Sequence, residues 1–269
     1  MDRSRLSLNS ITVKSLSFQE LVGVATGFGI PAIAPWRDLF EAFPVHEARA
    51  ILDNEGLAVS SLCRGGLFTA VDSSDRRRAI DDNLRAIDEA AVLGAQCLVL
   101  VCGPVVGKDV RVSYAMVLDG IAEILPYAAK AGVSLSLEPL HPMMAADRSV
   151  ICTLGQAHAV LSEFQDPTLG VCVDAYHVWW DVDLEPALNQ LAGRVRGFHV
   201  SDWVTPIQGQ LSSRGMMGDG CIDLSGMAAA VARTGYDGYV EVEILSDYWW
   251  SRPPNEVVST LVSRFASDV

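Results

Sequence analysis

Four short apolar segments of this chain each end in a side chain that can bind a metal ion or move a proton. The four closing residues are Glu138, Asp174, His199 and Glu243. A carboxylate or imidazole at the end of a buried strand is costly to place there without a partner. A separate ion pair or a carbonyl contact would explain any one of them. Four in succession indicate that the strand ends converge on a common centre.

Three carboxylates and one imidazole make a mixed set of oxygen and nitrogen ligands. Such a set suits Mn²⁺, Mg²⁺ or Co²⁺ better than a metal that prefers thiolates. Around one divalent cation, three carboxylates leave a net negative centre, so one of them can remain basic. In the last segment we favour Glu243 as the ligand, and we expect Glu241 to point to the opposite side of the strand.

Strand-like and helix-like segments alternate along the whole chain and predict eight strand–helix units. The predicted strands cover 6–11, 30–36, 57–63, 96–102, 135–138, 169–174, 195–201 and 239–245. The predicted helices cover 18–26, 45–55, 74–93, 112–131, 153–164, 184–191, 224–234 and 255–266, with an irregular segment over 203–222. We expect Ser73 or Ser74 to cap the predicted helix 74–93, and Gly94 to end it.

Eight such units predict an α/β fold, a (β/α)8 TIM barrel formed by one domain over residues 1–269. The competing fold is an open doubly wound sheet, but no GxGxxG motif follows the first strand. In a barrel the C-terminal strand ends form the active-site face, and the four closing residues all lie at such ends.

Composition excludes several classes of protein. The chain has 269 residues, of which 50% are hydrophobic, so a large core is available. The net charge of −13 and only three lysines argue against nucleic acid and against a polybasic membrane patch. Six scattered cysteines without a CxxC pair do not predict a disulfide framework. With neither a signal peptide nor a membrane-spanning run in the pattern, we expect a cytoplasmic protein, and we expect it to be a homo-oligomer.

The sequence around the strand ends resembles a known family in five places. These segments are LEPL (137–140), VDAYH (173–177), FHVSD (198–202), GDGCID (218–223) and GYDG…VE (235–243). They are similar to the xylose isomerase-like TIM barrels, which include ketose 3-epimerases, hydroxypyruvate isomerase, inosose dehydratase and the endonuclease IV group. The resemblance covers most of the chain, although the early strands match only in pattern. It implies one divalent metal ion, with Mn²⁺ favoured and Mg²⁺ or Co²⁺ as alternatives, held by Glu138, Asp174, His199 and Glu243.

In the epimerase branch of that family, two metal-bound glutamates also act as acid and base on opposite faces of the substrate. Glu138 and Glu243 match those positions. The resemblance therefore implies an isomerase or epimerase of a small sugar or polyhydroxy carbonyl compound, with proton transfer through a metal-stabilised enediolate. His177 matches a histidine that contacts a substrate oxygen, although a solvated histidine at a helix start is the alternative.

Other side chains near the strand ends are candidates for substrate binding. Arg214 precedes a glycine-rich loop, where its guanidinium fork can bind hydroxyl or carboxylate oxygens, unless it is a surface arginine in a mobile loop. Further candidates for substrate contacts are Arg64, Arg148, His141 and Trp36. Asp202 is expected either to orient His199 as a partner behind the metal or to cap the following turn.

Two departures from the family pattern leave the reaction open. No lysine follows Glu138, which disfavours a two-metal hydride shift, and Met144 stands where some ketose epimerases carry a glutamate. A dehydratase or lyase acting on a keto-sugar or inosose would begin with the same proton abstraction. A nuclease needs more histidine ligands than the five histidines here supply. A non-catalytic sugar-binding barrel that serves as a subunit is the alternative outside catalysis.

Overall fold

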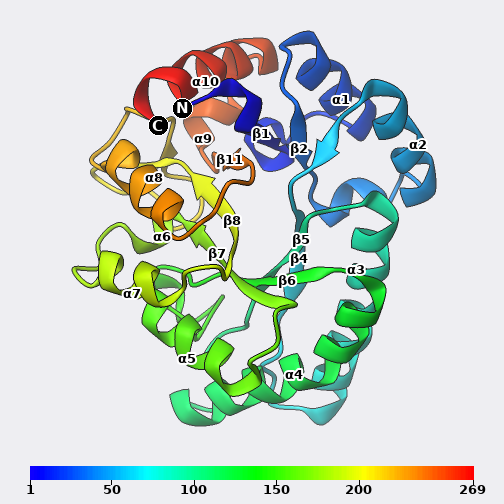
Figure 1. The fold of residues 1–269 in the computed structure, drawn as a ribbon, viewed down its shortest axis with the longest axis vertical. Coiled ribbons are helices and arrows are strands. Elements are labelled where there is room, and N and C mark those ends of the chain that lie inside the picture. The colour runs from blue at the N-terminus through cyan, green and yellow to red at the C-terminus, as the bar shows by residue number, and fades with distance from the viewer.

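A ring of parallel strands lies at the centre of the molecule, and the helices pack around its outside (Figure 1). The structure is a computed structural model that describes all 269 residues. The strands of the ring are β1 (Leu6–Asn9), β2 (Ala32–Ala34), β3 (Ala58–Val59), β4 (Leu62–Gly66), β5 (Cys97–Val101), β6 (Ser134–Leu137), β7 (Leu169–Asp174), β8 (Val195–Val200) and β11 (Val240–Val242). Their order is β3-β2-β1-β11-β8-β7-β6-β5-β4. The predicted (β/α)8 barrel is confirmed.

The third position of the barrel is occupied by two short strands where the sequence predicts one. β3 pairs with β2 and β4 pairs with β5, so the ring closes through the two residues between them, Ser60 and Ser61. Both serines are buried. At the end of β4 a Cβ on Gly66 would lie 2.0 Å from the carbonyl oxygen of Val101, and its φ of 100° also requires glycine. This tight approach joins β4 to β5 beside the interrupted strand.

The helices follow the strands as the pattern predicts, with bounds that differ by a few residues. They are α1 (Phe18–Gly27), α2 (Val45–Glu55), α3 (Ser73–Leu93), α4 (Val110–Ala131), α5 (Leu154–Phe164), α6 (Ala175–Val178), α7 (Leu184–Gln190), α8 (Leu224–Arg233), α9 (Asp247–Trp250) and α10 (Pro254–Asp268). Gly94 ends α3 in the left-handed conformation, as expected. The prediction that Ser73 or Ser74 caps α3 is wrong, because the helix already includes both and Asp72 is its N-cap.

The segment predicted to be irregular contains a small antiparallel pair, β9 (Asp202–Trp203) and β10 (Arg214–Gly215). Arg214 pairs with Trp203 in this hairpin. Strands of two residues are too short to produce a recognisable alternation, which explains why the sequence did not predict them. The hairpin returns the chain to the C-terminal strand ends and so brings Arg214 back to the mouth of the barrel.

Apolar packing joins the barrel to its outer helices in a core cluster of 65 buried residues. Helix α4 is long and apolar enough to cross a membrane by length and composition. Its buried residues, among them Val117, Ile121 and Ile124, belong to the same core cluster, as in an outer helix of a barrel.

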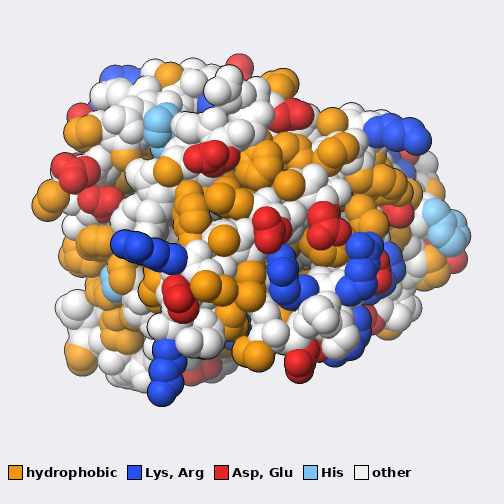
Figure 2. All heavy atoms as spheres, turned by 90° about the horizontal axis from the view of Figure 1, so that it is seen from below, with side chains coloured by type: hydrophobic (Ala, Val, Ile, Leu, Met, Phe, Trp, Pro, Cys, Tyr) orange, Lys and Arg blue, Asp and Glu red, His pale blue; other side chains and the backbone are white.

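The six cysteines are all free. On the face shown in Figure 2, basic and acidic side chains lie near one another and do not form a large patch of one sign. The chain's first 3₁₀ turn (Arg3–Arg5) and α10 lie together where the termini meet (Figure 1).

Candidate metal centre and active site

The four predicted ligands come from four successive strands of the barrel. Asp174 ends β7 and pairs in register with His199 of β8. Glu138 directly follows β6, and Glu243 directly follows β11; each donates its backbone N–H to a carbonyl of the neighbouring strand. Because parallel strands end at the same edge of the barrel, these positions bring all four side chains to its mouth.

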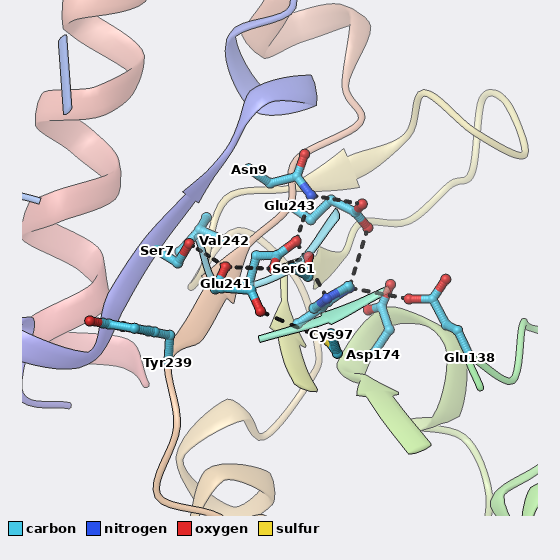
Figure 3. Close-up of polar contacts among 12 residues, drawn as sticks. Ser7, Asn9, Ser61, Cys97, Glu138, Asp174, Tyr239, Glu241, Val242 and Glu243 are labelled. Carbon is cyan, nitrogen blue, oxygen red and sulfur yellow. Dashed lines mark hydrogen bonds and ion pairs between the residues drawn. The ribbon is translucent and has the colours of Figure 1, made fainter. Parts of the chain in front are cut away.

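The metal-binding atoms of these four side chains all lie within 4.8 Å of one another. Nδ1 of His199 is 3.1 Å from Oε1 of Glu138 and 3.9 Å from Oε2 of Glu243. None of the four residues is more than 5% exposed. Figure 3 shows Glu138, Asp174 and Glu243 gathered around one point. Three buried carboxylates this close to one another need a cation to balance their charge.

Several polar atoms of this cluster have no hydrogen-bond partner within the protein. They are Oε1 of Glu138 and both ring nitrogens of His199. Buried polar atoms are nearly always paired, so an unpaired group calls for an explanation such as a bound ion. Carboxylate oxygens and one imidazole nitrogen are donors that divalent cations accept. The residues at the mouth therefore fit a divalent metal ion.

Arg214 is the one cationic side chain that reaches into this cluster. Its Nη1 donates to Oδ2 of Asp174 at 2.8 Å and to Oε2 of Glu243 at 3.0 Å. Its Nη2 lies 3.1 Å from Nε2 of His177, and its guanidinium carbon lies 4.6 Å from the centre of the Tyr176 ring. Since Arg214 is only 5% exposed, the alternative of a surface arginine in a mobile loop is wrong.

The surroundings of the site shift the pKa values of two of its carboxyl groups in opposite directions. Burial raises the pKa of Glu243 to about 7, against the opposing effect of Arg214. Burial acts in the same direction on Asp174, but the nearby guanidinium of Arg214 outweighs it and lowers the pKa of Asp174. Burial also lowers the pKa of His177 to about 3, so this imidazole is neutral. A carboxyl group with a pKa near neutrality can both accept and return a proton.

The predicted substrate contacts differ in how close they lie to the cluster. His177 is buried and lies 3.5 Å from Asp174, so it is not a solvated histidine at a helix start. His141 is next to it, since the backbone N–H of His141 donates to Nδ1 of His177 at 3.2 Å. The side chains of Arg64 and Arg148 make no hydrogen bond or ion pair, and they stay predictions. The same holds for Trp36, whose buried Nε1 has no partner.

A pocket of about 460 Å³ opens beside the mouth, between the hairpin loop and α9. Its lining includes Arg214, Ser246 and Trp249. On another side of the mouth, the ring of Trp203 packs against Tyr176 at 4.7 Å and against His141 at 4.9 Å between centroids. The hairpin thus contributes both a charged and an aromatic side chain to the walls of the candidate site.

Asp202 does not orient His199. Its carboxylate accepts hydrogen bonds from the backbone N–H groups of Gly218, Gly220 and Ile222, at 2.8 to 3.1 Å. The expectation that Asp202 orients the metal ligand His199 is therefore wrong. The alternative, that Asp202 caps the following turn, describes this residue. Asp202 fixes the glycine-rich loop that follows the hairpin.

The expected position of Glu241 is also wrong. Side chains two residues apart in a strand point to the same face, so Glu241 and Glu243 both face the barrel interior. Nδ2 of Asn9 donates to both, at 2.6 Å to Glu241 and 3.1 Å to Glu243. Three more residues of this region, Asn9, Ser60 and Ser61, are neutral residues in or beside the early strands, and the sequence did not predict them. The period of two along β11 was the signal that could have placed Glu241 correctly.

Comparisons with known proteins agree with this barrel. The family model described as xylose isomerase-like TIM barrel matches residues 24–266. A ketose 3-epimerase from Arthrobacter globiformis is 30% identical over 225 residues, which cover 79% of this chain and 72% of that protein.

Two solved structures are similar over almost their whole length. Protein SMc04130 from Sinorhizobium meliloti 1021 has a TM-score of 0.96 and 46% identity, with 99% of each chain covered. The IOLI protein, whose structure contains a bound zinc atom, has a TM-score of 0.85 and 18% identity, with 98% of each chain covered. By fold, by the matched family model and by its epimerase relative, this chain belongs to the xylose isomerase-like TIM barrel family.

Proposed function

We propose that this protein is a divalent-metal-dependent isomerase or epimerase of a small sugar or polyhydroxy carbonyl compound. The observation that carries the proposal is the buried cluster of Glu138, Asp174, His199 and Glu243, whose binding atoms lie within 4.8 Å of one another. The unpaired atoms of Glu138 and His199 support a bound ion at its centre. The similarity to a ketose 3-epimerase supports a sugar as the substrate.

A divalent cation bound by these four residues would stabilise the negative charge that develops on the substrate when an α-proton leaves. The proton itself needs a base on one face of the substrate and an acid on the other. Glu138 and Glu243 follow β6 and β11, which are separated by β7 and β8, so they approach the centre from different sides. We assign these two glutamates to the proton transfers, with an enediolate of the substrate between the two steps.

Arg214 and His177 supply the groups that orient the substrate. Arg214 has further guanidinium N–H groups, and the neutral His177 can share a hydrogen bond with a hydroxyl or carbonyl oxygen. Both residues are buried, so these contacts would form away from bulk water and would be strong. Arg64, Arg148, His141 and Trp36 are proposed to contact the more distant parts of the substrate.

The donor set also bears on the metal. Three carboxylates and one imidazole favour Mn²⁺, with Mg²⁺ and Co²⁺ as alternatives, and the zinc atom in the IOLI protein adds Zn²⁺ to the ions that must be tested. A location in the cytoplasm and a homo-oligomeric state are part of the proposal. Metal-free protein titrated with each of the four ions would rank them directly.

Incubation of the metal-loaded protein with ketoses and 2-keto-inositols in deuterated water tests the reaction. Epimerisation through an enediolate incorporates one deuterium at the carbon next to the carbonyl and keeps the mass otherwise unchanged. Loss of one water would instead identify a dehydratase. If no compound exchanges deuterium while sugars still bind, the protein is a binding barrel and the proposed reaction is wrong. Mass spectrometry and proton NMR of the recovered sugars distinguish the three outcomes.

A further inference from the structure

A fourth buried carboxylate lies immediately below the candidate metal centre, toward the inside of the barrel. Glu241 is only 2% exposed. Its Oε2 accepts hydrogen bonds from Ser61 at 2.8 Å and from Ser60 at 3.0 Å, and its Oε1 accepts one from Asn9 at 2.6 Å. Figure 3 shows Glu241 beside Asn9, Ser61 and Glu243. Three donors hold this carboxylate in one position, although it is not a predicted ligand.

Glu241 also faces the ring of His199. Nε2 of His199 lies 3.4 Å from Oε1 of Glu241, whereas Nδ1, on the other side of the ring, faces Glu138 at 3.1 Å. A neutral imidazole carries its proton on one nitrogen only, and the partner of each nitrogen decides which one. Nε2 of His199 has no hydrogen-bond partner, and Glu241 is the carboxylate that faces it, so a proton on Nε2 would point toward Glu241 and leave the lone pair of Nδ1 free.

We propose that Glu241 is a positioning residue that keeps the proton of His199 on Nε2 and directs Nδ1 toward the metal ion. Histidine ligands of metals usually donate their second N–H to a carboxylate or carbonyl, which fixes the ring and makes the ligating nitrogen more basic. Here the carboxylate comes from the same strand as Glu243, two residues earlier. The inference rests on the proposed metal centre and adds the group that orients its only nitrogen ligand.

The surroundings of His199 offer one competing partner, the thiol of Cys172, whose sulfur lies within 4.8 Å of the binding atoms of His199 and Glu138. A thiol is a weak acceptor, so the charged Glu241 is the stronger partner for an N–H group. The Nδ2 group of Asn9 links Glu241 to Glu243 through its two hydrogen bonds. Displacement of Glu241 would therefore disturb one ligand directly and another through Asn9.

The test is the affinity of the metal-free full-length protein for Mn²⁺ and Zn²⁺, measured by calorimetry with a competing chelator. Wild type is compared with Glu241→Gln and Glu241→Ala. Loss of a partner behind a metal ligand typically weakens metal binding about 10- to 100-fold, and we expect this range, with the larger loss for alanine. The matched control is Asp202→Asn, which converts another buried carboxylate near the mouth that bonds only backbone N–H groups. The control should lower the melting temperature and leave metal affinity within about twofold.

The outcomes separate this inference from the proposed function. If wild type binds the ions and both Glu241 variants bind them equally well, the positioning role is wrong and the metal centre stands. If wild type binds none of the ions, the metal centre itself is wrong and the inference falls with it. Should the Glu241 variants not fold, Ser61→Ala removes one of the three bonds that hold the carboxylate, and a few-fold loss of affinity is then expected.

A spectroscopic measurement on wild type needs no variant. Nitrogen-15 NMR of the Zn²⁺-loaded protein, labelled at histidine, reports which ring nitrogen of each of the five histidines carries a proton. We expect the His199 signals to show a protonated Nε2 and a metal-bound Nδ1. A protonated Nδ1, or a metal-bound Nε2, would overturn the role given to Glu241.

Discussion

The two halves of the barrel contribute different kinds of side chain to the same centre. Strands β6, β7, β8 and β11 end in charged or titratable groups, the four candidate ligands. The early half contributes neutral groups, Asn9 at the end of β1 and the serines between β3 and β4, and all three donate to Glu241. The late half thus carries the charge, and the early half supplies hydrogen bonds that hold one carboxylate in place.

This difference follows from the cost of burying charge. A buried carboxylate needs compensation, either from a cation or from several hydrogen-bond donors. Glu241 has three neutral donors, whereas Oε1 of Glu138 has none. Two glutamates of the same barrel, Glu241 and Glu138, therefore have opposite environments. Glu241, which already accepts three hydrogen bonds, is suited to hold its neighbours in place. Glu138, whose Oε1 has no hydrogen-bond partner, is suited to bind an ion or a substrate.

The largest effect is expected from Glu138→Gln in the charged half. Removal of a general acid–base group costs about 10²–10⁴ in turnover, and here the same change also removes a metal ligand. We expect kcat for deuterium exchange into the substrate to fall by at least about a hundredfold. The late half would not carry the reactive groups if Glu138→Gln kept more than a tenth of the wild-type rate while an early-half variant such as Asn9→Ala lost all activity.

A second test uses pH. Because the pKa of Glu243 is raised to about 7 from its ordinary value near 4.5, the folded metal-free protein holds a proton there that the unfolded chain lacks between these values. The contribution of Glu243 to stability therefore decreases as pH rises through about 7. A metal ion competes with this proton, so its affinity should rise about tenfold per pH unit up to about pH 7 and then level off.

Calorimetry between pH 5.5 and 8 in two buffers of different ionisation enthalpy measures both the affinity and the number of protons released. In Glu243→Gln, the step near pH 7 should disappear. An affinity that stays flat from pH 5.5 to 7 in wild type would mean that Glu243 is already ionised and does not exchange its proton for the metal ion.

Arg214→Gln tests how the positive charge of Arg214 affects metal binding in the late half of the barrel. Arg214 bonds both Asp174 and Glu243, and a positive charge beside a metal ion weakens its binding. We expect about tenfold tighter metal binding in the variant, together with a lower melting temperature of the metal-free form, because two buried carboxylates lose their partner. Arg264→Gln is the matched control for metal binding, since Arg264 pairs with Asp219 in a more exposed position and should leave metal affinity unchanged. Equal or weaker metal binding by Arg214→Gln would contradict the charge-balancing role.

The same difference between the halves explains what the sequence could predict. Charged residues that close apolar runs are conspicuous, so the strand ends at Glu138, Asp174 and His199 could be located, and the barrel followed from the alternation of elements. Asn9 and Ser60 could not be identified, because small neutral residues occur in many strands and the break between β3 and β4 depends on tertiary pairing. The hairpin that carries Arg214 was missed for the same reason, since its pairing is set by contacts across the mouth.

The smallest effect is expected one hydrogen bond further from the metal, at Ser7. Its hydroxyl lies 2.7 Å from that of Ser60 and makes no contact with a carboxylate. Ser7→Ala removes a buried hydrogen bond, which costs about 1 kcal/mol of unfolding free energy by chemical denaturation. Metal affinity should stay within about twofold, since Ser61 and Asn9 still hold Glu241. If Ser7→Ala weakened metal binding as strongly as Glu241→Gln, the early half would act as one cooperative network, and the assignment of positioning to the single carboxylate would be too narrow.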